Sequence, residues 1–344
     1  MAGDPYAAML HIVLEKPGRF AAEDRPEPPA GPGLALVRVH RIGVCGTDLH
    51  AFAGDQPFFS YPRVLGHELG VEVVDAGDEP GGLKPGDRCS VEPYLNCGRC
   101  SACRRGRPNC CAELKVLGVH VDGGMRPLLR VPARKLHASA RLTYDQLALV
   151  ETLGIGAHAV ERAALAPDDF VLVIGAGPIG LSVIQFARLS GAAVAVMDVS
   201  DRRLEFCRSH FGGIRALKPG AGADDELRRI GGDLPTCVID ATGNPRSMAG
   251  SFSLPANGGR IVFVGLFQGE VAFDDPNFHR RELTLSGSRN SLPSTFREVI
   301  RLVEEGSVDT RPWITHRLRL DETPGVFPRD IAGNPEVLKA MIEV

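Results

Sequence analysis

Apolar positions in the middle of the chain follow two alternating spacings. Runs of about five consecutive apolar residues predict buried strands, and the segments between them repeat their apolar residues with helical spacing. Strands that alternate with helices need crossover connections, which predict a parallel sheet covered by helices. The predicted elements are, in order, Phe170–Ile174, Ile179–Leu189, Ala193–Met197, Arg202–Phe211, Cys237–Ile239 and Arg260–Val264.

The flanking segments have a different pattern. Residues 8–150 are rich in Val, Gly and Pro and contain short alternating runs such as Ala35–Ile42, which predict strands and turns. Two further helices are predicted, one over Gly156–Ala164 and one over Ser294–Glu305, the second ending at Gly306.

A length of 344 residues exceeds the size at which a single core usually stops growing, so we expect two domains. Residues 305–344 contain four prolines and do not continue the alternation of strands and helices, so we expect this segment to return to the first domain rather than to extend the parallel sheet. The predicted layout is a discontinuous β-rich domain formed by residues 1–153 and 291–344, with an α/β domain at residues 154–290 inserted into it. The inserted domain should contain a doubly wound parallel sheet.

Charge and hydropathy argue against nucleic-acid and membrane partners. The formal net charge is -3, and the most basic run, Arg104–Arg107, lies within a cysteine-rich segment. Phe170–Ala187 is uncharged over eighteen residues, but Gly175–Gly180 interrupts it, which indicates a strand, a turn and a helix rather than a membrane span. The N-terminus lacks a basic segment followed by an apolar one, so no secretory signal is expected.

Four cysteines stand close together, at positions Cys97, Cys100, Cys103 and Cys111. Four thiolates in so short a segment predict one tetrahedral structural zinc ion, whose complete ligand set leaves no position for a substrate. The alternative is a group of buried or disulfide-linked cysteines, which the neighbouring Gly, Arg and Asn residues disfavour. The remaining five of the nine cysteines show no paired spacing, which indicates a reducing, cytoplasmic compartment.

A glycine-rich motif follows the first of the predicted parallel strands. Gly175, Gly177 and Gly180 lie between a strand and a helix, which is the context of a dinucleotide-binding fingerprint. The first glycine permits a tight turn, the second lets a pyrophosphate approach the backbone, and the third allows close packing of helix and strand. The diphosphate would lie at the helix N-terminus. The alternative interpretation is a strand-to-helix turn without a ligand.

Asp198 ends the next predicted strand, eighteen residues after the third glycine. A carboxylate there can accept hydrogen bonds from both adenosine ribose hydroxyls and would repel a 2′-phosphate, which favours NAD over NADP. Arg202 and Arg203 are guanidinium groups of the kind that accommodate a 2′-phosphate, so NADP remains the alternative. The strands that end near Thr242 and Gly265 should reach the same crevice.

Cys45 and His67 are candidate ligands of a second metal ion, because both side chains bind zinc and neither belongs to the four-cysteine group. The third ligand could be the adjacent Glu68 or the more distant Glu151. Each of these residues alone is more often an ordinary structural residue, so the prediction depends on their joint occurrence.

Taken together, these motifs resemble a known family. Cys45-Gly-Thr-Asp, Gly66-His67-Glu68, the four cysteines, Glu151 and Gly175-Ala-Gly-Pro-Ile-Gly180 follow the order and spacing of the zinc-dependent medium-chain dehydrogenases/reductases. The resemblance covers essentially the whole chain. Glu151 and the run from Cys45 to His50 resemble the sorbitol and threonine dehydrogenase-like branch. Gly118–Gly124 and Gly287–Asn290 resemble bacterial sugar-acid dehydrogenases of the galactonate/gulonate type.

The resemblance implies a fold and a reaction. It implies a GroES-like β-rich catalytic domain and a Rossmann cofactor domain. Cys45, His67 and a glutamate would hold a catalytic zinc ion with an open position, where the substrate hydroxyl loses its proton. Asp48 would orient His67, and Thr47 would pass the proton through the cofactor ribose towards His50. Hydride would then move to the nicotinamide.

The residues expected to contact the cofactor lie in the glycine-rich loop or at strand ends. They are Gly175, Gly177, Pro178, Ile179, Gly180, Asp198, Arg203, Thr242, Gly265, Ser288 and Arg289. Arg289 is also a candidate partner for an anionic substrate.

The expected function is therefore NAD-dependent oxidation of a secondary hydroxyl of a polyol, sugar or sugar acid, with about two zinc ions per chain in a homodimer or homotetramer. The alternatives are an amino-alcohol substrate such as threonine, and a non-catalytic zinc- and nucleotide-binding regulatory protein. One departure from the family pattern stands out. The glycine usually found three residues after the glutamate of Gly-His-Glu is replaced by Val71, and Gly70 precedes it, so we expect altered backbone packing near the metal.

Overall fold

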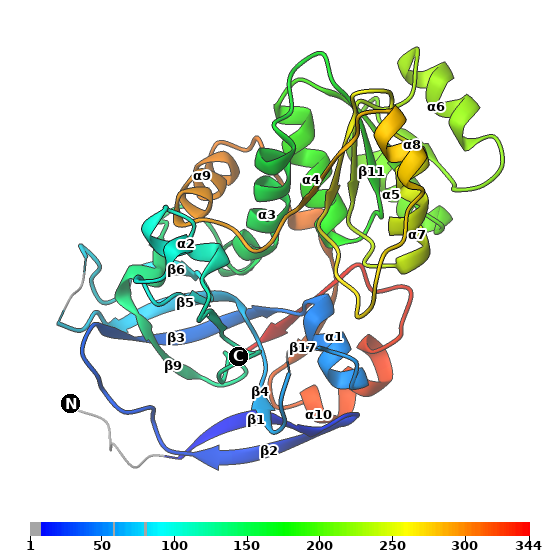
Figure 1. Ribbon diagram of the computed structural model, residues 1–344. Helices are drawn as coiled ribbons and strands as arrows, with labels where there is room; N and C mark the ends of the chain where they lie inside the picture. The colour runs from blue at the N-terminus through cyan, green and yellow to red at the C-terminus, as the bar shows by residue number, and fades with distance from the viewer. Residues whose placement is uncertain (1–7, 58, 79–80) are drawn as a thin grey trace. The chain divides into compact units, whose positions relative to one another are not determined.

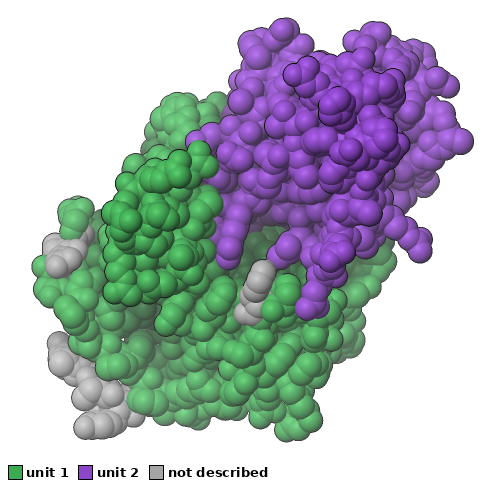
Figure 2. Space-filling model, viewed as in Figure 1, with its two compact units in different colours: residues 1–151, 292–344 green, residues 152–291 purple. Residues whose placement is uncertain are grey.

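The computed structural model describes residues 8–57, 59–78 and 81–344. The chain divides into two compact units, the first formed by residues up to 151 together with 292–344 and the second by residues 152–291 (Figure 2). The domain limits expected from the sequence, at 153/154 and 290/291, stay a prediction.

The first unit is built around a large, mostly antiparallel sheet. Among the described residues its strand order is β10-β6-β5-β3-β18-β17, and β9 also pairs with β3 (Figure 1). A smaller sheet has the order β2-β1-β4, and β7 pairs with β8. The strands are β1 (Met9–Lys16), β2 (Arg19–Arg25), β3 (Leu34–Gly43), β4 (Arg63–Val64), β5 (Glu68–Asp75), β6 (Arg88–Val91), β7 (Tyr94–Leu95), β8 (Lys115–Val116), β9 (Leu128–Pro132), β10 (Leu136–Ala138), β17 (Ile314–Arg319) and β18 (Lys339–Glu343).

Five α-helices accompany these strands among the described residues. Helix α3 is the longest of them, and its second half belongs to the second unit. The helices are α1 (Gly46–Ala53), α2 (Ser101–Arg104), α3 (Tyr144–Ala163), α9 (Pro293–Glu304) and α10 (Thr323–Val326).

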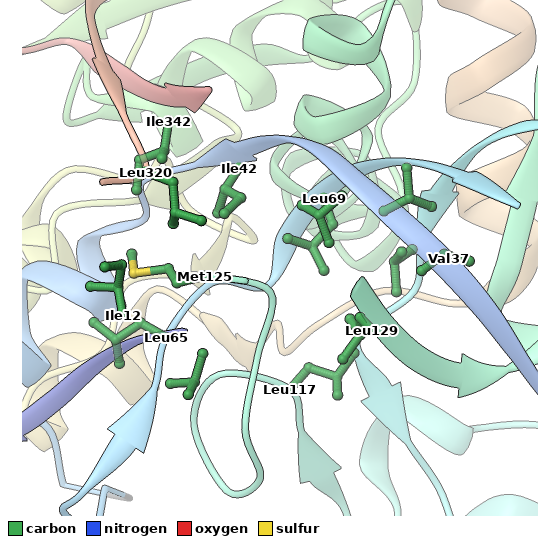
Figure 3. Close-up of a cluster of buried hydrophobic side chains, with 14 of the residues drawn as sticks. Ile12, Val37, Ile42, Leu65, Leu69, Leu117, Met125, Leu129, Leu320 and Ile342 are labelled. Atoms are coloured by element: carbon green, nitrogen blue, oxygen red, sulfur yellow. The ribbon is translucent and has the colours of Figure 1, made fainter. Parts of the chain in front are cut away.

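An apolar cluster fills the interior of the first unit. Side chains from separate strands, such as Ile12, Ile42 and Leu69, have no exposed surface, and Leu65 and Met125 fill the space between them (Figure 3). Complete burial of one such side chain contributes about 1.5–3 kcal/mol, so the cluster holds β1, β3 and β5 in fixed positions. The candidate metal ligands Cys45 and Glu68 lie at the ends of β3 and β5.

Residues 305–344 belong to the first unit, and the two strands that they form, β17 and β18, contain no proline. Strand β18 pairs antiparallel with β3, with Ile342 opposite Ile42, and pairs parallel with β17. The segment that follows the second unit therefore supplies two strands to the sheet of the first.

Gly70 lies where β5 comes close to the start of α3. A Cβ atom at this position would be 2.1 Å from the carbonyl oxygen of Tyr144. Strand β3 carries an extra residue here, because its register with β5 shifts between Val39 and Arg41. Gly70 therefore lies opposite a β-bulge, at a close approach of helix and strand. Whether this packing differs from that of the family stays a prediction.

Helix α3 begins at Tyr144, whereas the sequence pattern predicts a helix only from Gly156. Residues 147–150 have no exposed surface, so no polar face reveals their helical spacing. The sequence signal for the start of this helix is a capping box formed by Thr143 and Gln146. The Gln146 backbone N–H donates to Thr143 Oγ1 at 3.3 Å, and the Thr143 N–H donates to Gln146 Oε1 at 3.0 Å.

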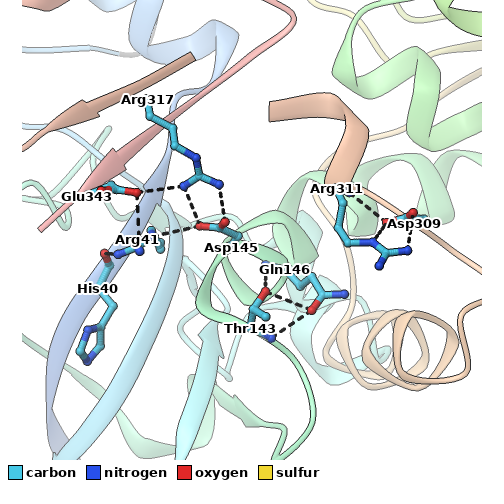
Figure 4. A network of polar contacts seen from close by, with 9 residues as sticks. All are labelled: His40, Arg41, Thr143, Asp145, Gln146, Asp309, Arg311, Arg317 and Glu343. Atoms are coloured by element: carbon cyan, nitrogen blue, oxygen red, sulfur yellow. Dashed lines mark hydrogen bonds and ion pairs between the residues drawn. The ribbon is translucent and has the colours of Figure 1, made fainter. Parts of the chain in front are cut away.

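Ion pairs attach the start of α3 to the sheet (Figure 4). Asp145 lies 3.0 Å from Arg41 of β3 and 2.5 Å from Arg317 of β17, and Arg317 lies 3.0 Å from Glu343 of β18. A carboxylate in the first turn also interacts favourably with the helix dipole. These contacts fix the orientation of the helix that carries Glu151.

The second unit is built on a parallel sheet, as predicted. Its strand order is β13-β12-β11-β14-β15-β16. Numbered along the chain, this order is 3-2-1-4-5-6, that of the doubly wound dinucleotide-binding fold. The strands are β11 (Phe170–Ile174), β12 (Ala193–Met197), β13 (Arg215–Leu217), β14 (Cys237–Asp240), β15 (Arg260–Phe263) and β16 (Thr284–Gly287), and the helices are α4 (Pro178–Leu189), α5 (Asp201–His210), α6 (Ala223–Gly231), α7 (Pro245–Gly250) and α8 (Asp275–Arg280).

The pattern missed the two edge strands of this sheet. Strand β13 has one buried residue and β16 has none, so neither shows the apolar run typical of a central strand. The uncharged segment Phe170–Ala187 forms β11, a turn and most of α4. In the described parts of the chain, no helix has both the length and the apolar character that a membrane span requires.

Candidate functional site

The four-cysteine lobe, residues Cys97–Cys111, brings its four sulfur atoms together. All four Sγ atoms lie within 4.8 Å of one another, and every cysteine in the chain is free. Backbone N–H groups point at the sulfurs: that of Cys97 donates to Cys111 at 3.2 Å, and that of Cys100 donates to Cys97 at 3.4 Å. Backbone hydrogen bonds, first from Ala112, lower the pKa of Cys100 to about 6. The donor set fits one tetrahedral zinc ion held by thiolates.

A second group, the ligand cluster of Cys45, His67 and Glu68, lies at the ends of two elements of the first unit. Cys45 precedes α1, and Glu68 begins β5 directly after His67. One ligand atom from each residue lies within 4.8 Å of the other two, and both His67 and Glu68 are buried. A Cβ at Gly43 would be 2.0 Å from Glu68 Oε2, so only glycine at this position leaves room for the carboxylate.

Unpaired buried atoms beside the cluster support a metal site. His67 Nδ1 and Asp48 Oδ1 face each other at 3.9 Å, and neither has a hydrogen-bond partner among the described residues. Asp48 Oδ2 accepts a hydrogen bond from the Cys45 backbone N–H at 2.9 Å. Because Nδ1 faces Asp48, the other ring nitrogen is the one available to a metal ion shared with Cys45. Sulfur, imidazole and carboxylate in one buried cluster suit zinc.

Burial and charge act against each other in this cluster. Burial lowers the pKa of His67, but the nearby Cys45 and Asp48 outweigh it and raise this pKa well above its ordinary value. Burial raises the pKa of Asp48 and of Glu151, and His67 is the main opposing influence on both. A bound cation would favour the ionised form of every acidic group here.

Two buried residues that the sequence analysis missed hold the two glutamates. Lys339 of β18 lies 2.6 Å from Oε1 and 2.5 Å from Oε2 of Glu68. The Tyr94 hydroxyl of β7 donates to Glu151 Oε1, and both side chains are buried. Glu151 is close enough to influence His67 and Lys339 electrostatically, but it lies outside the compact ligand cluster.

The predicted proton-relay residues lie on α1. Thr47 is half-buried in the first turn. The His50 side chain is 59% exposed in the last turn, with Nδ1 2.9 Å from Asp55 Oδ1. The structure does not bring His50 into the ligand cluster, so its role in a relay remains a prediction.

The glycine-rich loop of the second unit has the geometry that its sequence predicts. Gly175 has φ +96°, a conformation that favours glycine, and a Cβ at Gly180 would be 1.7 Å from the Gly175 carbonyl oxygen. Gly177 caps α4, and the half-buried Pro178 and Ile179 form the start of its first turn. The N-terminus of this twelve-residue helix offers unpaired N–H groups and a positive dipole to an anion.

Asp198 is tied to this loop through the backbone. Its Oδ2 accepts a hydrogen bond from the Ala176 N–H at 2.6 Å, and its Oδ1 accepts one from the Ser200 N–H at 2.8 Å. Each carboxylate oxygen has a second lone pair, so Asp198 can still accept from a ribose hydroxyl. The Arg203 guanidinium approaches Gly177, with Nη1 3.9 Å from where a Cβ would lie.

The remaining predicted cofactor residues lie at or near the ends of β14, β15 and β16. The Thr242 hydroxyl donates to Asp240 at 2.6 Å, and a Cβ at Gly265 would be 2.1 Å from the Gly243 nitrogen. Ser288 Oγ is buried without a partner among the described residues, and Arg289 beside it is exposed. Their roles as cofactor contacts remain predictions.

Two family models match the chain. The model described as "Alcohol dehydrogenase GroES-like domain" matches residues 31–141, and the model described as "Zinc-binding dehydrogenase" matches residues 178–305. L-galactonate-5-dehydrogenase of Escherichia coli K12 is 43% identical over 338 residues, which cover 98% of this chain and 99% of that protein.

Solved structures share the fold over the whole length. An NADH complex of the alcohol dehydrogenase rspB from Escherichia coli CFT073 has a TM-score of 0.89 at 28% identity and covers 98% of this chain and 99% of that chain. An NADP complex from Sinorhizobium meliloti 1021, described as a zinc-binding dehydrogenase, has a TM-score of 0.88 at 30% identity and covers 98% and 100%. The chain therefore belongs to the zinc-binding alcohol dehydrogenase family with a GroES-like domain, the medium-chain dehydrogenases/reductases.

Proposed function

We propose that this protein is a zinc-dependent dehydrogenase that oxidises a secondary hydroxyl of a polyol, sugar or sugar acid with NAD. The observation that carries the proposal is the ligand cluster of the half-buried Cys45 and the buried His67 and Glu68, which offers three protein ligands rather than four. Three ligands leave a coordination position for a substrate, whereas the four-cysteine lobe leaves none.

The residues of the first unit would act by holding the metal and its ligands. A zinc ion at the cluster would supply a Lewis acid that lowers the pKa of the substrate hydroxyl. Cys45 and His67 would bind it, with Glu68 as the third ligand and Glu151 nearby as a carboxylate that can exchange with it or bind through water. Asp48 would orient the His67 ring from its unmetallated side. Thr47 would accept the substrate proton and pass it towards His50.

The residues of the second unit would bind the cofactor. Gly175, Gly177 and Gly180 leave space for a diphosphate at the N-terminus of α4. Asp198 supports NAD over NADP, because its carboxylate would repel a 2′-phosphate. Solved relatives have been crystallised with NADH and with NADP, so Arg203 keeps NADP as the alternative.

The substrate class is supported by a relative over nearly the full length. The Escherichia coli protein at 43% identity is named for oxidation of L-galactonate at carbon 5, a secondary alcohol of a sugar acid. Arg289 is the residue we propose for a substrate carboxylate.

The test is to mix zinc-loaded protein with NAD or NADP and a panel of aldonates, polyols and L-threonine, and to follow the absorbance of the reduced nicotinamide. We expect the highest kcat/KM for a sugar acid with NAD. Turnover of threonine alone would identify an amino-alcohol dehydrogenase instead, and no turnover on any substrate would contradict the proposed function.

We also propose that the protein is a homodimer or homotetramer in a reducing, cytoplasmic environment. The edge strand β16 exposes Leu285 at 40%, and an exposed apolar sheet edge is a surface that a second copy can cover. Free cysteines throughout the chain suit a reducing compartment. Light scattering of the purified protein would give the oligomeric state.

A further inference from the structure

The contact between Tyr94 and Glu151 joins two parts of the first unit that are 57 residues apart in sequence. Tyr94 is 3% exposed and Glu151 is 5% exposed, so this hydrogen bond joins a buried donor to a buried carboxylate. The aromatic ring is also fixed, because it packs edge-on against Phe296 with ring centroids 6.3 Å apart. The hydroxyl thus reaches Glu151 from a side chain that cannot easily turn away.

Tyr94 stands at the base of the four-cysteine lobe. It pairs with Val116 in the two-stranded β7–β8 ladder, and the chain between these strands contains all four cysteines of the lobe. The Leu117 N–H extends the ladder by donating to the Pro93 carbonyl at 3.1 Å. Contacts that keep the lobe closed therefore also help to keep Tyr94 paired with Val116.

The lobe has little apolar core to close it. Over residues 95–114, a fully described segment, the buried side chains are those of Asn109, Cys111 and Leu114. The sulfur atoms instead organise the lobe, receiving the Cys97 and Cys100 N–H groups and an Asn96 side-chain contact to Cys103 at 3.7 Å. A segment of this kind depends on metal binding for its fold.

We propose that Tyr94 is a positioning residue that fixes the Glu151 carboxylate near His67, and that a metal ion in the four-cysteine lobe helps to hold Tyr94 there by keeping β7 paired with β8. The inference rests on the proposed function, in which Glu151 helps to hold the catalytic zinc. The two metal sites are then coupled: through Tyr94, the metal ion in the lobe strengthens binding of the metal ion in the ligand cluster.

The first test is Tyr94→Phe, which removes the hydroxyl and keeps the ring. The matched control is Tyr144→Phe, because the Tyr144 hydroxyl also donates to a carboxylate, that of Glu72 at 3.0 Å. Zinc release to a chromophoric chelator is followed without substrate. We expect the ligand cluster of Tyr94→Phe to bind its zinc ion about tenfold less tightly than in the wild type, and the four-cysteine lobe to bind its zinc ion unchanged. The control should behave as the wild type at both sites. Equal retention in Tyr94→Phe and Tyr144→Phe would overturn the proposal.

The second test opens the lobe with Cys103→Ser, alone and combined with Tyr94→Phe. If the lobe acts through Tyr94, Cys103→Ser alone weakens binding of the remaining zinc, and the double variant is no worse than Tyr94→Phe alone. Multiplying effects would contradict the coupling. If Cys103→Ser does not fold, Asn96→Ala replaces it, because this change weakens the same lobe without removing a ligand.

Steady-state kinetics separate this inference from the proposed function. Reduced kcat with little change in KM is expected for Tyr94→Phe, since the hydroxyl contacts a metal-site carboxylate and not the substrate. Failure of the wild type to turn over any substrate would contradict the proposed function, but the zinc-release measurements would still decide the role of Tyr94.

Discussion

Gly43 determines whether the Glu68 carboxylate can occupy its position in the ligand cluster. It has no side chain to contribute, yet its missing Cβ is the space that Glu68 Oε2 occupies. Lys339 Nζ donates to the same carboxylate, at 2.6 Å from Glu68 Oε1. A glycine and a lysine from neighbouring strands thus fix the position of one proposed metal ligand.

Gly43→Ala should therefore expel the Glu68 carboxylate from its position. We expect the zinc content to fall from about two ions per chain to about one, because the ligand cluster loses a donor while the lobe does not. The control is Gly46→Ala, where a Cβ meets nothing within 4 Å. Two retained zinc ions in Gly43→Ala, measured by atomic absorption, would show that Glu68 is not needed for binding.

Lys339→Met tests the buried ion pair. Lys339 and Glu68 are 2% and 1% exposed, so the substitution leaves a buried carboxylate without its cation. Losing one partner of such a pair costs about 3–5 kcal/mol, which urea unfolding would measure. Lys218→Met breaks a pair with Asp201 in which both side chains are more than half exposed, and should change stability by less than about 1 kcal/mol. Similar losses in both variants would contradict the assignment.

At the scale of elements, the glycine-rich loop depends on a helix and a strand approaching closely. Gly180→Ala would bring a Cβ to 1.7 Å from the Gly175 carbonyl oxygen, so α4 has to move away from the loop. We expect NAD affinity to fall at least about tenfold, since the helix N-terminus no longer faces the diphosphate. Titration calorimetry would measure this, with Gly250→Ala as a control at an uncrowded helical position. Unchanged affinity would place the cofactor elsewhere.

The Asp169 carboxylate links several segments of the second unit through hydrogen bonds. It accepts hydrogen bonds from the Ala166 N–H at 2.8 Å, from the Thr236 hydroxyl at 2.6 Å and from Arg260. Burial alone would raise its pKa, but these donors outweigh burial and lower the pKa below its ordinary value. A lowered pKa in the folded state stabilises the protein above the unfolded pKa of about 3.9, and this contribution is lost as the pH falls further.

Asp169→Asn should therefore be less stable than the wild type by about 1–3 kcal/mol at pH 7. The difference should shrink as the pH falls below about 4, because the wild-type carboxyl then becomes protonated as well. Urea midpoints of both proteins across this range would measure it. Glu205→Gln, which alters an exposed pair with Arg208, serves as the control and should differ little at any pH. A constant difference would rule out the ionised carboxylate as the cause.

Elements also differ in how well their bounds can be predicted from the sequence. Strands β11 and β12 have the predicted bounds, because a central parallel strand is apolar throughout. The first half of α3 was missed because burial on all sides removes the helical period. Cys45, His67 and Glu68 could be predicted from residue type and resemblance. Their supporting partners could not, since a contact such as Lys339 to Glu68 spans 271 residues and leaves no local pattern.

At the scale of the whole molecule, two proposed zinc sites in one unit should be separable. Cys45→Ala removes a ligand of the cluster but none of the lobe, so we expect about one zinc ion per chain, no dehydrogenase activity and an unchanged circular dichroism spectrum. Cys89→Ala is the control, because Cys89 is buried in β6 away from both ligand sets. Two zinc ions in Cys45→Ala would contradict the assignment of the reactive site.

The pairing of β18 with β3 has a consequence for how the protein is made. Glu68 leaves the ribosome 271 residues before Lys339, the cation that compensates it. At a synthesis rate of 5–20 residues per second, this delay is on the order of tens of seconds. During that time β3 has an open edge where β18 will pair, and the second unit is synthesised in between. Of the two units, the one that begins synthesis first is therefore completed last, and its proposed metal site can form completely only after the second unit has emerged.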